Sequence, residues 1–309
     1  MENTDYDLVI IGGGPAGLTA GLYAARARLN VIMLEMITPG GQILVTDWIE
    51  NYPGFPDGLT GTELVQRMTD QAKHFGLNIE SEEVMSLDLS NPVKKIELAD
   101  GSHVSTHAII IATGASPGKL GIPGEEKYTG RGVSFCGTCD GPFFRDKVVA
   151  AVGGGDTAVQ ETLFLTKFVK KVYLIHRRDE LRAAKILQER AFANDKIEIL
   201  WDSVVTQIDG LTNVEKVTLK NVKTEDEREL PVDGCFIWVG ITPNTGFLEG
   251  QSILNEYGFI QVDANMATTI PGVFAAGDVR NTPLRQVVTA VGDAAIAVAS
   301  AEHYIDTIK

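Results

Sequence analysis

The chain has 309 residues, of which 44% are hydrophobic and 22% charged, and its formal net charge is −14 at pH 7. This length predicts about two domains with buried cores. The acidic balance argues against a nucleic-acid partner, because phosphate binding needs clustered lysine and arginine. No run of about 18 apolar residues is present, so we expect no membrane span. Three cysteines and an acidic start without a signal-peptide pattern predict a cytoplasmic protein.

The first 35 residues read as strand, glycine-rich turn, helix and strand. The first strand is the β-branched run at Val9–Ile11, residues 18–28 have a helix pattern, and Val31–Glu35 reads as a buried strand. The turn between them follows a G-x-G-x-x-G pattern, which predicts a dinucleotide-binding loop at the start of the helix. The turn residues are Gly12, Gly14, Pro15, Ala16 and Gly17.

The same unit recurs from residue 147, with a strand, a glycine-rich turn, a helix pattern through residue 168 and a strand at Val172–His176. The turn residues in this second copy are Gly153, Gly155, Asp156, Thr157 and Ala158. The first glycine of such a loop permits the tight turn, the second lets the backbone approach a pyrophosphate, and the third position must be small. One such motif is weak evidence, but two in the same context favour two bound nucleotides over two turns without a ligand.

The two copies differ at the end of their second strands. The first ends in Glu35, whose carboxylate suits ribose hydroxyls and would repel a 2′-phosphate. The second has no acid there and instead has His176, Arg177 and Arg178, followed by Arg182. Guanidinium groups bind phosphate in a bidentate manner. We therefore expect FAD on the first copy and NADPH on the second; the alternative is that the arginines form a solvated basic face.

Two segments rich in glycine and proline bracket the second copy. One follows a buried strand that ends near Thr113 and Gly114, and the other is residues 240–246, after a strand at 234–239. They predict an α/β protein of two Rossmann-like domains, the second inserted into the first. The expected bounds are 1–116 and 247–309 for the FAD domain and 117–246 for the NADPH domain. A helix pattern at about 285–305 closes the chain.

A Cys-x-x-Cys pair, Cys136 and Cys139, precedes the second glycine loop and is followed by Asp140. Such a pair can be half of a zinc site, a structural disulfide or a catalytic dithiol. No second ligand pair is present in the sequence, and a cytosolic chain argues against a structural disulfide, so we expect a dithiol and no metal. Asp140 is a candidate acid/base for thiol–disulfide exchange, or it caps the next turn.

The remaining cysteine and most of the histidines show no functional spacing. Cys235 lies in the apolar strand at 234–239, so we interpret it as an inert core thiol. His74, His103, His107 and His303 have no spacing partner, and we assign them to surfaces or loops.

Taken in order, the two glycine loops, the Cys-x-x-Cys-Asp motif, His176–Arg178 and the pair Gly277–Asp278 resemble the low-molecular-weight, bacterial-type thioredoxin reductases, class II of the pyridine nucleotide-disulfide oxidoreductases. The resemblance runs nearly end to end. It implies FAD, NADPH, a thioredoxin-like protein substrate and a homodimer. It also implies a rotation of one domain that turns the dithiol from the flavin to the substrate.

The resemblance also implies roles for individual residues. Cys139 would lie next to the flavin, Cys136 would attack the substrate disulfide, and Asp140 would be the acid/base. Asp278 would hold the ribityl chain. Other flavin contacts would come from Gly41, Gln42, Asn51, Thr113, Gly114, Gly277, and from Arg285, Gln286 and Val287 at the start of the last helix. One departure is Gly137, where the family usually has alanine, which gives the turn more freedom.

Other functions remain open at this point. A ferredoxin–NADP reductase of the same fold would not need the two cysteines. A reductase for another dithiol carrier, or an oxidase that forms disulfides, would need them. A nucleotide sensor without enzymatic activity would bind NADP through Arg177 and Arg178 and leave the dithiol idle.

Overall fold

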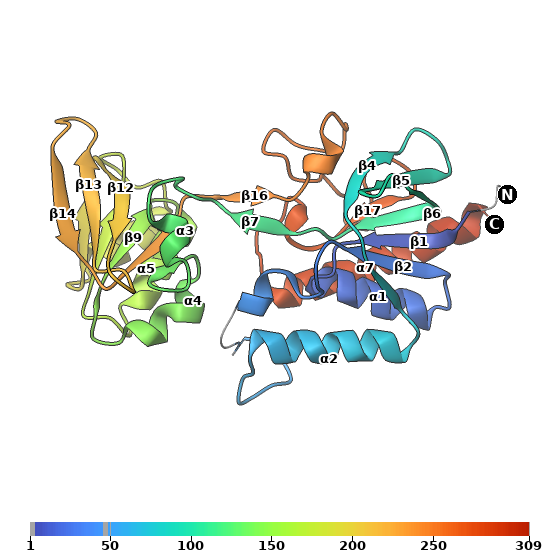
Figure 1. Ribbon diagram of the computed structural model, residues 1–309, viewed down its shortest axis with the longest axis horizontal. Coiled ribbons are helices and arrows are strands. Elements are labelled where there is room, and N and C mark those ends of the chain that lie inside the picture. Colours follow the sequence, from blue (N-terminus) through green and yellow to red (C-terminus); the bar gives the residue numbers. More distant parts are fainter. Residues whose placement is uncertain (1–3, 46–48, 50, 309) are drawn as a thin grey trace. The chain divides into compact units, whose positions relative to one another are not determined.

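The computed structural model describes residues 4–45, 49 and 51–308, apart from the side chains of Val45, Thr138 and Cys139. The chain divides into two compact units (Figure 1). The first comprises Met1–Ser116 and Thr242–Lys309, and the second comprises Pro117–Ile241. The first boundary coincides with the one expected from the sequence, whereas the return crossing lies at 241/242 and not at 246/247.

The first unit contains a sheet in the order β3-β2-β1-β6-β5-β4, with β17 also paired to β6. The pairs among β1, β2, β3, β6 and β17 are parallel, and β4 and β5 are antiparallel additions. The strands are β1 (Tyr6–Ile11), β2 (Val31–Glu35), β3 (Asn78–Ser81), β4 (Val84–Asp88), β5 (Lys94–Leu98), β6 (His103–Ile111) and β17 (Val273–Ala275).

The long helices cover one face of this sheet, whereas Leu248 and Val279, from short helical segments, belong to the core on the other face. The helical segments are α1 (Pro15–Arg26), η1 (Gly41–Val45), α2 (Gly61–His74), η3 (Gly246–Leu248), η4 (Gly277–Val279) and α7 (Val287–Ile308). Side chains alternate along a strand, so Leu8 and Ile10 pack with α1 and α7, while Val9 and Ile11 join a second core on the other face. Figure 1 shows α1 and α7 on the same face. This double burial explains the apolar run that identified β1 in the sequence.

The second unit has a parallel sheet in the order β11-β10-β9-β15-β8 and an antiparallel sheet β12-β13-β14. Its strands are β8 (Val133–Ser134), β9 (Val148–Gly153), β10 (Lys171–Ile175), β11 (Ile197–Leu200), β12 (Ser203–Asp209), β13 (Lys216–Asn221), β14 (Glu227–Pro231) and β15 (Gly234–Trp238). Its helical segments are α3 (Glu125–Tyr128), α4 (Gly137–Asp140), η2 (Gly141–Phe144), α5 (Asp156–Leu165) and α6 (Lys185–Phe192).

The parallel sheet of the second unit is also buried on both faces. Val149 and Ala151 of β9 belong to the core beneath α5 and α6, whereas Ala150 and Val152 belong to the core shared with the antiparallel sheet. Both units therefore place a glycine loop at the carboxyl end of a central parallel strand. That edge is where open α/β sheets bind ligands.

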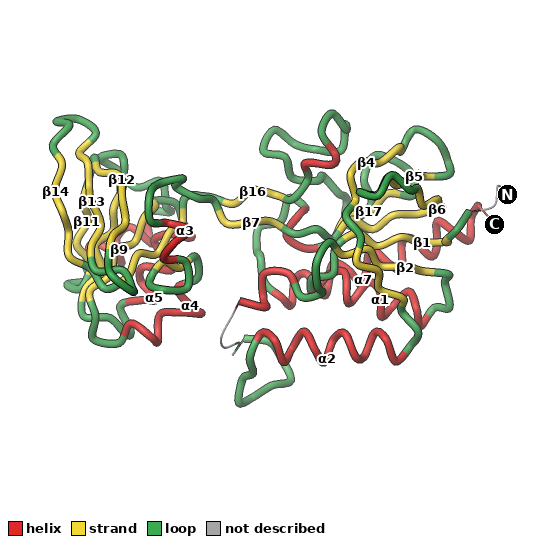
Figure 2. Tube along the Cα trace, viewed as in Figure 1, coloured by secondary structure: helices red, strands yellow, loops and turns green. Residues whose placement is uncertain are grey.

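The two connections between the units pair with each other as β7 (Ala115–Pro117) and β16 (Ile241–Pro243) (Figure 2). Asn244 fixes the returning chain to the end of β6: its backbone N–H donates to the Gly114 carbonyl (3.0 Å), and its Nδ2 donates to the Thr113 carbonyl (2.8 Å). The Thr113 hydroxyl donates to the Asn244 carbonyl at 2.8 Å. These bonds explain why the chain rejoins the first unit at residue 242, before the end of the predicted linker at Gly246.

One histidine assignment is wrong. His107 lies inside β6 and only 7% of it is exposed, because this end of β6 is enclosed on both faces. Cys235 is a buried free thiol in β15, and burial raises its pKa to about 12, so its interpretation as a core thiol is confirmed. No helix within the described ranges combines the length and apolarity needed to cross a bilayer.

Candidate functional site

The first glycine loop, between β1 and α1, is shaped by close backbone approaches. Gly12 has φ +102°, and a Cβ there would lie 2.6 Å from the Ala112 carbonyl oxygen; a Cβ on Gly17 would lie 1.8 Å from the Gly12 oxygen. A Cβ on Gly14, by contrast, would meet nothing within 4 Å among the described atoms. Gly14 is the N-cap of α1 and supplies no side chain to cap it, while Pro15 occupies the first turn. The space beside Gly14, at the amino end of α1, is therefore open, which fits a pyrophosphate.

Glu35 ends β2 beside this loop. Its Oε2 accepts a hydrogen bond from the Gly13 N–H at 2.6 Å, and its Oε1 accepts one from the Ile37 N–H at 3.2 Å. Two backbone donors thus hold the carboxylate at the edge of the loop, with lone pairs left for further donors. This position fits ribose hydroxyls and disfavours a phosphate.

The segment after β2 folds back onto the same loop. The Gly40 N–H donates to the Gly13 carbonyl at 2.8 Å, and Gly41, with φ +59°, lies so close that a Cβ on it would be 3.4 Å from the Gly14 Cα. Gln42 follows in η1 and is exposed. The structure therefore brings Gly41 to the first glycine loop, and the contacts of Gly41 and Gln42 with a flavin stay a prediction.

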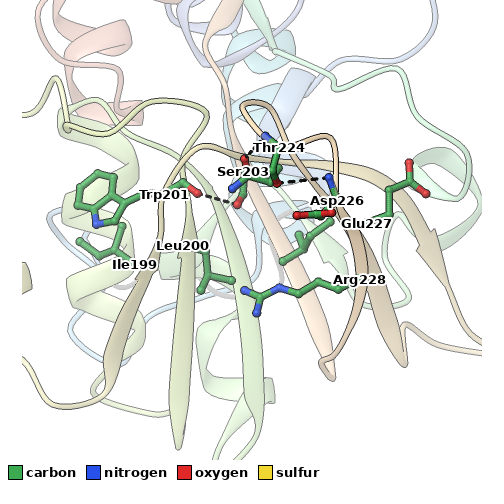
Figure 3. Close-up of a pocket in the computed structure, with 10 residues that line it drawn as sticks. Ile199, Leu200, Trp201, Ser203, Thr224, Asp226, Glu227 and Arg228 are labelled. Atoms are coloured by element: carbon green, nitrogen blue, oxygen red, sulfur yellow. Dashed lines mark hydrogen bonds between the residues drawn. The ribbon is translucent and has the colours of Figure 1, made fainter.

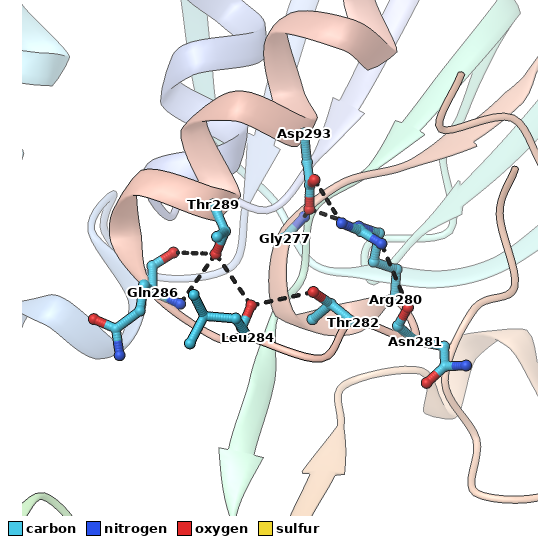
Figure 4. Close-up of polar contacts among 8 residues, drawn as sticks. All are labelled: Gly277, Arg280, Asn281, Thr282, Leu284, Gln286, Thr289 and Asp293. Carbon is cyan, nitrogen blue, oxygen red and sulfur yellow. Dashed lines mark hydrogen bonds and ion pairs between the residues drawn. The ribbon is translucent and has the colours of Figure 1, made fainter. Parts of the chain in front are cut away.

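A second pair of segments meets at the start of α7. Asn51 Nδ2 donates to Gln286 Oε1 at 2.8 Å, which joins two predicted flavin residues that lie 235 positions apart. Gln286 precedes Val287, the first residue of α7. The Gln286 N–H donates to Thr289 Oγ1 at 3.1 Å, so Thr289 fixes the first turn of the helix (Figure 4).

The Gly277–Asp278 segment is held by an ion pair that sequence reasoning missed. Arg280 donates to Asp293 of α7 through Nε and Nη2, each at 2.6 Å, and the Gly277 N–H donates to the same carboxylate at 3.1 Å (Figure 4). Both charged side chains are mostly buried. A bidentate pair of this kind fixes the backbone that presents Asp278. The signal in the sequence was Asp293, one of three acidic residues in a helix rich in alanine.

Asp278 and Arg285 are partly buried charges near this segment. Burial raises the pKa of Asp278, and Arg285 offsets part of that shift. Burial lowers the pKa of Arg285, whose guanidinium lies 4.7 Å from the centre of the Phe259 ring. Its Nε is buried and has no hydrogen-bond partner among the described residues. Orphaned buried donors are rare in proteins, so this one fits a site that a bound polar group completes.

The second glycine loop, between β9 and α5, repeats the geometry of the first. Gly153 has φ +152°, and a Cβ there would lie 2.5 Å from the Trp238 carbonyl oxygen and 2.6 Å from the Ala158 Cβ. Gly155 is the N-cap of α5, and a Cβ on it would meet nothing within 4 Å among the described atoms. Asp156 Oδ1 accepts a hydrogen bond from the Ala184 N–H at 2.7 Å, which ties the loop to the segment before α6. Thr157 is exposed on the first turn of α5.

His176 differs from the arginines that follow it. Its ring is 5% exposed and fills the space beneath Gly154, where an added Cβ would lie 2.2 Å from the His176 Cε1. Burial lowers the pKa of His176, and the charges of Arg182 and Arg178 lower it further. The neutral His176 ring therefore packs against the glycine loop at Gly154, and it does not extend into solvent at the end of β10.

The three arginines of the second loop are exposed, and none of them forms an ion pair within the described part of the chain. They are Arg177, Arg178 and Arg182. The Arg182 N–H donates to the Gly154 carbonyl at 2.7 Å, so its backbone is docked on the glycine loop. Three cations without partners beside an open helix N-terminus fit an additional phosphate group.

The predicted dithiol lies on a tight turn before η2. The Cys136 N–H donates to Ser134 Oγ at 3.1 Å, and the Asp140 N–H donates to the Cys136 carbonyl at 3.1 Å across α4. Trp238 Nε1 donates to the Phe135 carbonyl at 3.0 Å. Cys136 is disulfide-bonded and not a free thiol. The Cys139 side chain lies outside the described residues, so its pairing with Cys136 stays a prediction.

A pocket elsewhere in the second unit contains none of the predicted site residues. It lies between β11 and the turn that joins β13 to β14, and Trp201, Ser203 and Arg228 are among its lining residues (Figure 3). Asp226 and Glu227 also line it, so its lining contains side chains of both charges. We assign no role to this pocket in the chemistry of the cysteines.

Comparisons with known proteins agree with this fold. Residues 6–294 match the model of the family described as pyridine nucleotide-disulphide oxidoreductase. Thioredoxin reductase of Peptoclostridium litorale is 46% identical over 314 residues, covering 100% of this chain and 99% of the relative. Thioredoxin reductase of Bacillus subtilis (strain 168) is 44% identical and covers 100% and 97%. The crystal structure of thioredoxin reductase from Streptococcus pyogenes MGAS5005 superposes with a TM-score of 0.84 at 48% identity, covering 98% of each chain.

Proposed function

The chain belongs to the pyridine nucleotide-disulphide oxidoreductase family, and from that premise we propose that it reduces the disulfide of a thioredoxin with electrons from NADPH. The electrons would pass through FAD and a redox pair formed by Cys136 and Cys139. The observation that carries the proposal is the conjunction of two open glycine loops with a disulfide-bonded Cys136 on the turn before η2. Relatives that match this chain over nearly their whole length, and that are named thioredoxin reductase, support it.

The two loops divide the nucleotides between the two units. In the proposal, the first unit holds FAD through the Gly12–Gly17 loop and Glu35, with Asp278 and the start of α7 toward the flavin. The second unit holds NADPH through the Gly153–Ala158 loop and the arginines that follow β10. What supports this division is the carboxylate anchored beside the first loop and the exposed arginines beside the second, which form no ion pair in the described ranges. When bound, the two cofactors supply the electron pair that opens the disulfide.

The chain's own residues then carry out thiol–disulfide exchange. The thiolate of Cys136 attacks one sulfur of the substrate disulfide and forms a mixed disulfide, and the leaving sulfur takes a proton, for which Asp140 is the candidate donor. The thiolate of Cys139 then attacks the Cys136 sulfur. This step releases the second substrate thiol and restores the Cys136–Cys139 disulfide, so two sulfurs of the substrate are reduced and two of the enzyme are oxidised.

The site residues, the homodimer and the cytoplasmic location belong to the same proposal. The homodimer rests on the resemblance to bacterial-type thioredoxin reductases. The cytoplasmic location rests on the low number of cysteines, because secreted proteins of this kind would carry more disulfides. A reductase for another dithiol carrier, or an oxidase that forms disulfides, would use the same cysteines. Assays with thioredoxins, glutaredoxin-like proteins and oxygen as separate acceptors distinguish these functions.

The Cys136→Ser variant tests the path of the electrons. We expect NADPH to bleach the flavin of this variant as in the wild type, because both nucleotide loops remain intact. Thioredoxin reduction should fall to background, because the attacking sulfur is missing. Turnover of thioredoxin close to the wild-type rate would contradict the proposal.

A further inference from the structure

The turn that carries Cys136 is crowded on one side by α5 and β15. A Cβ on Gly137 would lie 2.6 Å from Glu161 Oε2 and 3.1 Å from Trp238 Cζ2. The φ of Gly137 lies outside the left-handed region, so the backbone does not require glycine here. Gly137 is therefore explained by lack of space next to a carboxylate and not by freedom of the turn.

The carboxylate is the movable member of this contact. Trp238 is held by its hydrogen bond to the Phe135 carbonyl and by stacking on Phe236, with ring centroids 5.6 Å apart. Glu161 is half-buried on α5, and its Oε2 is the end of a flexible side chain. A methyl group at position 137 would therefore displace the carboxylate while the indole stays in place.

Among the described residues of the turn, η2 and β15, few other titratable groups are present. Asp140 belongs to the turn itself and carries a second negative charge. η2 contains no titratable residue, and the Arg145 guanidinium that follows it lies 6.0 Å from the centre of the Phe168 ring. The one titratable residue of β15 is Cys235, which is fully buried in the core. The turn thus carries one carboxylate, that of Asp140, and a second carboxylate, that of Glu161, lies against Gly137.

We propose that Glu161 is a second carboxylate of the redox centre, a positioning residue whose charge limits the proportion of thiolate in the reduced dithiol. The inference rests on the proposed function in one respect, that Cys136 belongs to a redox dithiol. A nearby negative charge disfavours ionisation of a thiol, and the thiolate is the nucleophile in disulfide exchange. Gly137 completes the arrangement because it leaves room for the carboxylate.

Alkylation of the reduced protein measures this effect directly. The holoenzyme is reduced with dithiothreitol, freed of it, and treated with iodoacetamide from pH 5 to 10, and peptide mapping separates Cys136 and Cys139 from Cys235. For Glu161→Gln we expect the midpoint of the pH profile to fall by about 0.5–1 unit, which speeds alkylation at pH 7 by about threefold to tenfold. Gly137→Ala should shift the midpoint in the same direction by less, because it moves the carboxylate without removing it.

Two comparisons make the result decisive. Glu189→Gln on α6 removes the same charge from an exposed site of the same unit, and its midpoint should match that of the wild type. The double variant Gly137→Ala/Glu161→Gln should behave like Glu161→Gln alone, because both changes act on one carboxylate. A midpoint in Glu161→Gln that equals or exceeds the wild-type value would overturn the inference. Dithiothreitol replaces NADPH in this test, so its outcome is independent of whether the protein reduces thioredoxin.

Discussion

The two glycine loops have the same backbone design but opposite surroundings at the end of the following strand. In the first unit, the Glu35 carboxylate accepts a hydrogen bond from the Gly13 N–H and closes the position to a phosphate. In the second, the neutral His176 ring lies under Gly154, and it is followed by exposed arginines that form no ion pair with any residue that the structure describes. The comparison teaches that one loop geometry recurs in both units, while the residues at the strand end give each loop a different charge. In the proposed function, this charge decides between FAD and NADPH.

The largest expected effect comes from Gly17→Val in the first loop. A Cβ at this position would lie 1.8 Å from the Gly12 oxygen, and neither backbone segment can move without separating α1 from β1. We expect a loss of at least about 3 kcal/mol in the free energy of unfolding and loss of FAD.

Gly14→Ala is the matched control, because a Cβ at Gly14 meets open space. It should leave the unfolding free energy of the apoprotein within about 1 kcal/mol of the wild type and still weaken FAD binding. Denaturant unfolding and flavin fluorescence measure both quantities. Equal stability of the Gly17→Val variant and the wild type would show that the loop is not packed as described.

The next effect concerns the ion pair between Arg280 and Asp293, which holds the segment that contains Asp278. Arg280→Met leaves the Asp293 carboxylate buried without its partner, which should cost about 2–3 kcal/mol of stability in the first unit. FAD should dissociate more readily, while the affinity for NADPH on the second unit stays unchanged. Adding Asp293→Asn should recover much of the loss, because the amide oxygen still accepts from the Gly277 N–H. Retention of FAD by Arg280→Met at the wild-type level would show that the pair does not position this segment.

A smaller effect tests the arginines that follow β10 in the second unit. Arg177→Ala and Arg178→Ala should each raise the KM for NADPH by roughly 10-fold to 100-fold, because a hydrogen bond to a charged group contributes about 1.5–3 kcal/mol. The KM for NADH should change little, since NADH has no 2′-phosphate. The ratio of kcat/KM for the two nucleotides is the measurement. An equal loss with both would assign the arginines to another role.

The smallest effect is a pH dependence from Asp278. Burial raises the pKa of Asp278 above its ordinary value of 3.8, so the folded state binds a proton that the unfolded state has already lost. This carboxyl group therefore favours folding below pH 3.8, and its contribution is lost as the pH rises through the folded-state pKa. Asp278→Asn should make the apoprotein more stable relative to wild type at pH 7 than at pH 4, by denaturant unfolding. A difference of opposite sign would contradict the burial of the ionised group.

The parts of the molecule that rest on local pattern were predictable from sequence. The bounds of β2, Val31–Glu35, match the predicted strand, and both glycine loops have the local geometry that their spacing indicated. The boundaries of α1 were not predictable to the residue: it spans Pro15–Arg26 and not 18–28, because Gly14 and Pro15 start it and Arg28 has φ +62°.

Contacts between segments that lie far apart in the chain could not be predicted from the sequence. Arg280 with Asp293, and Glu161 beside Gly137, depend on how α7 and α5 pack, and neither pair has a fixed spacing that a motif would reveal. His176 was part of a motif that the sequence did reveal, but its environment was not predictable. Its place in the motif was visible, but its burial beneath Gly154 follows from the backbone path of the loop.

The most direct test of the electron path is an anaerobic titration of the flavin absorbance with NADPH, which compares the wild type with Cys136→Ser. If the flavin and the cysteine pair lie on one path, the wild type should take up about two equivalents of NADPH before the flavin is fully reduced, and the variant about one, because a disulfide accepts two electrons. The same end point in both proteins, at about one equivalent, would show that the cysteines receive no electrons from the flavin.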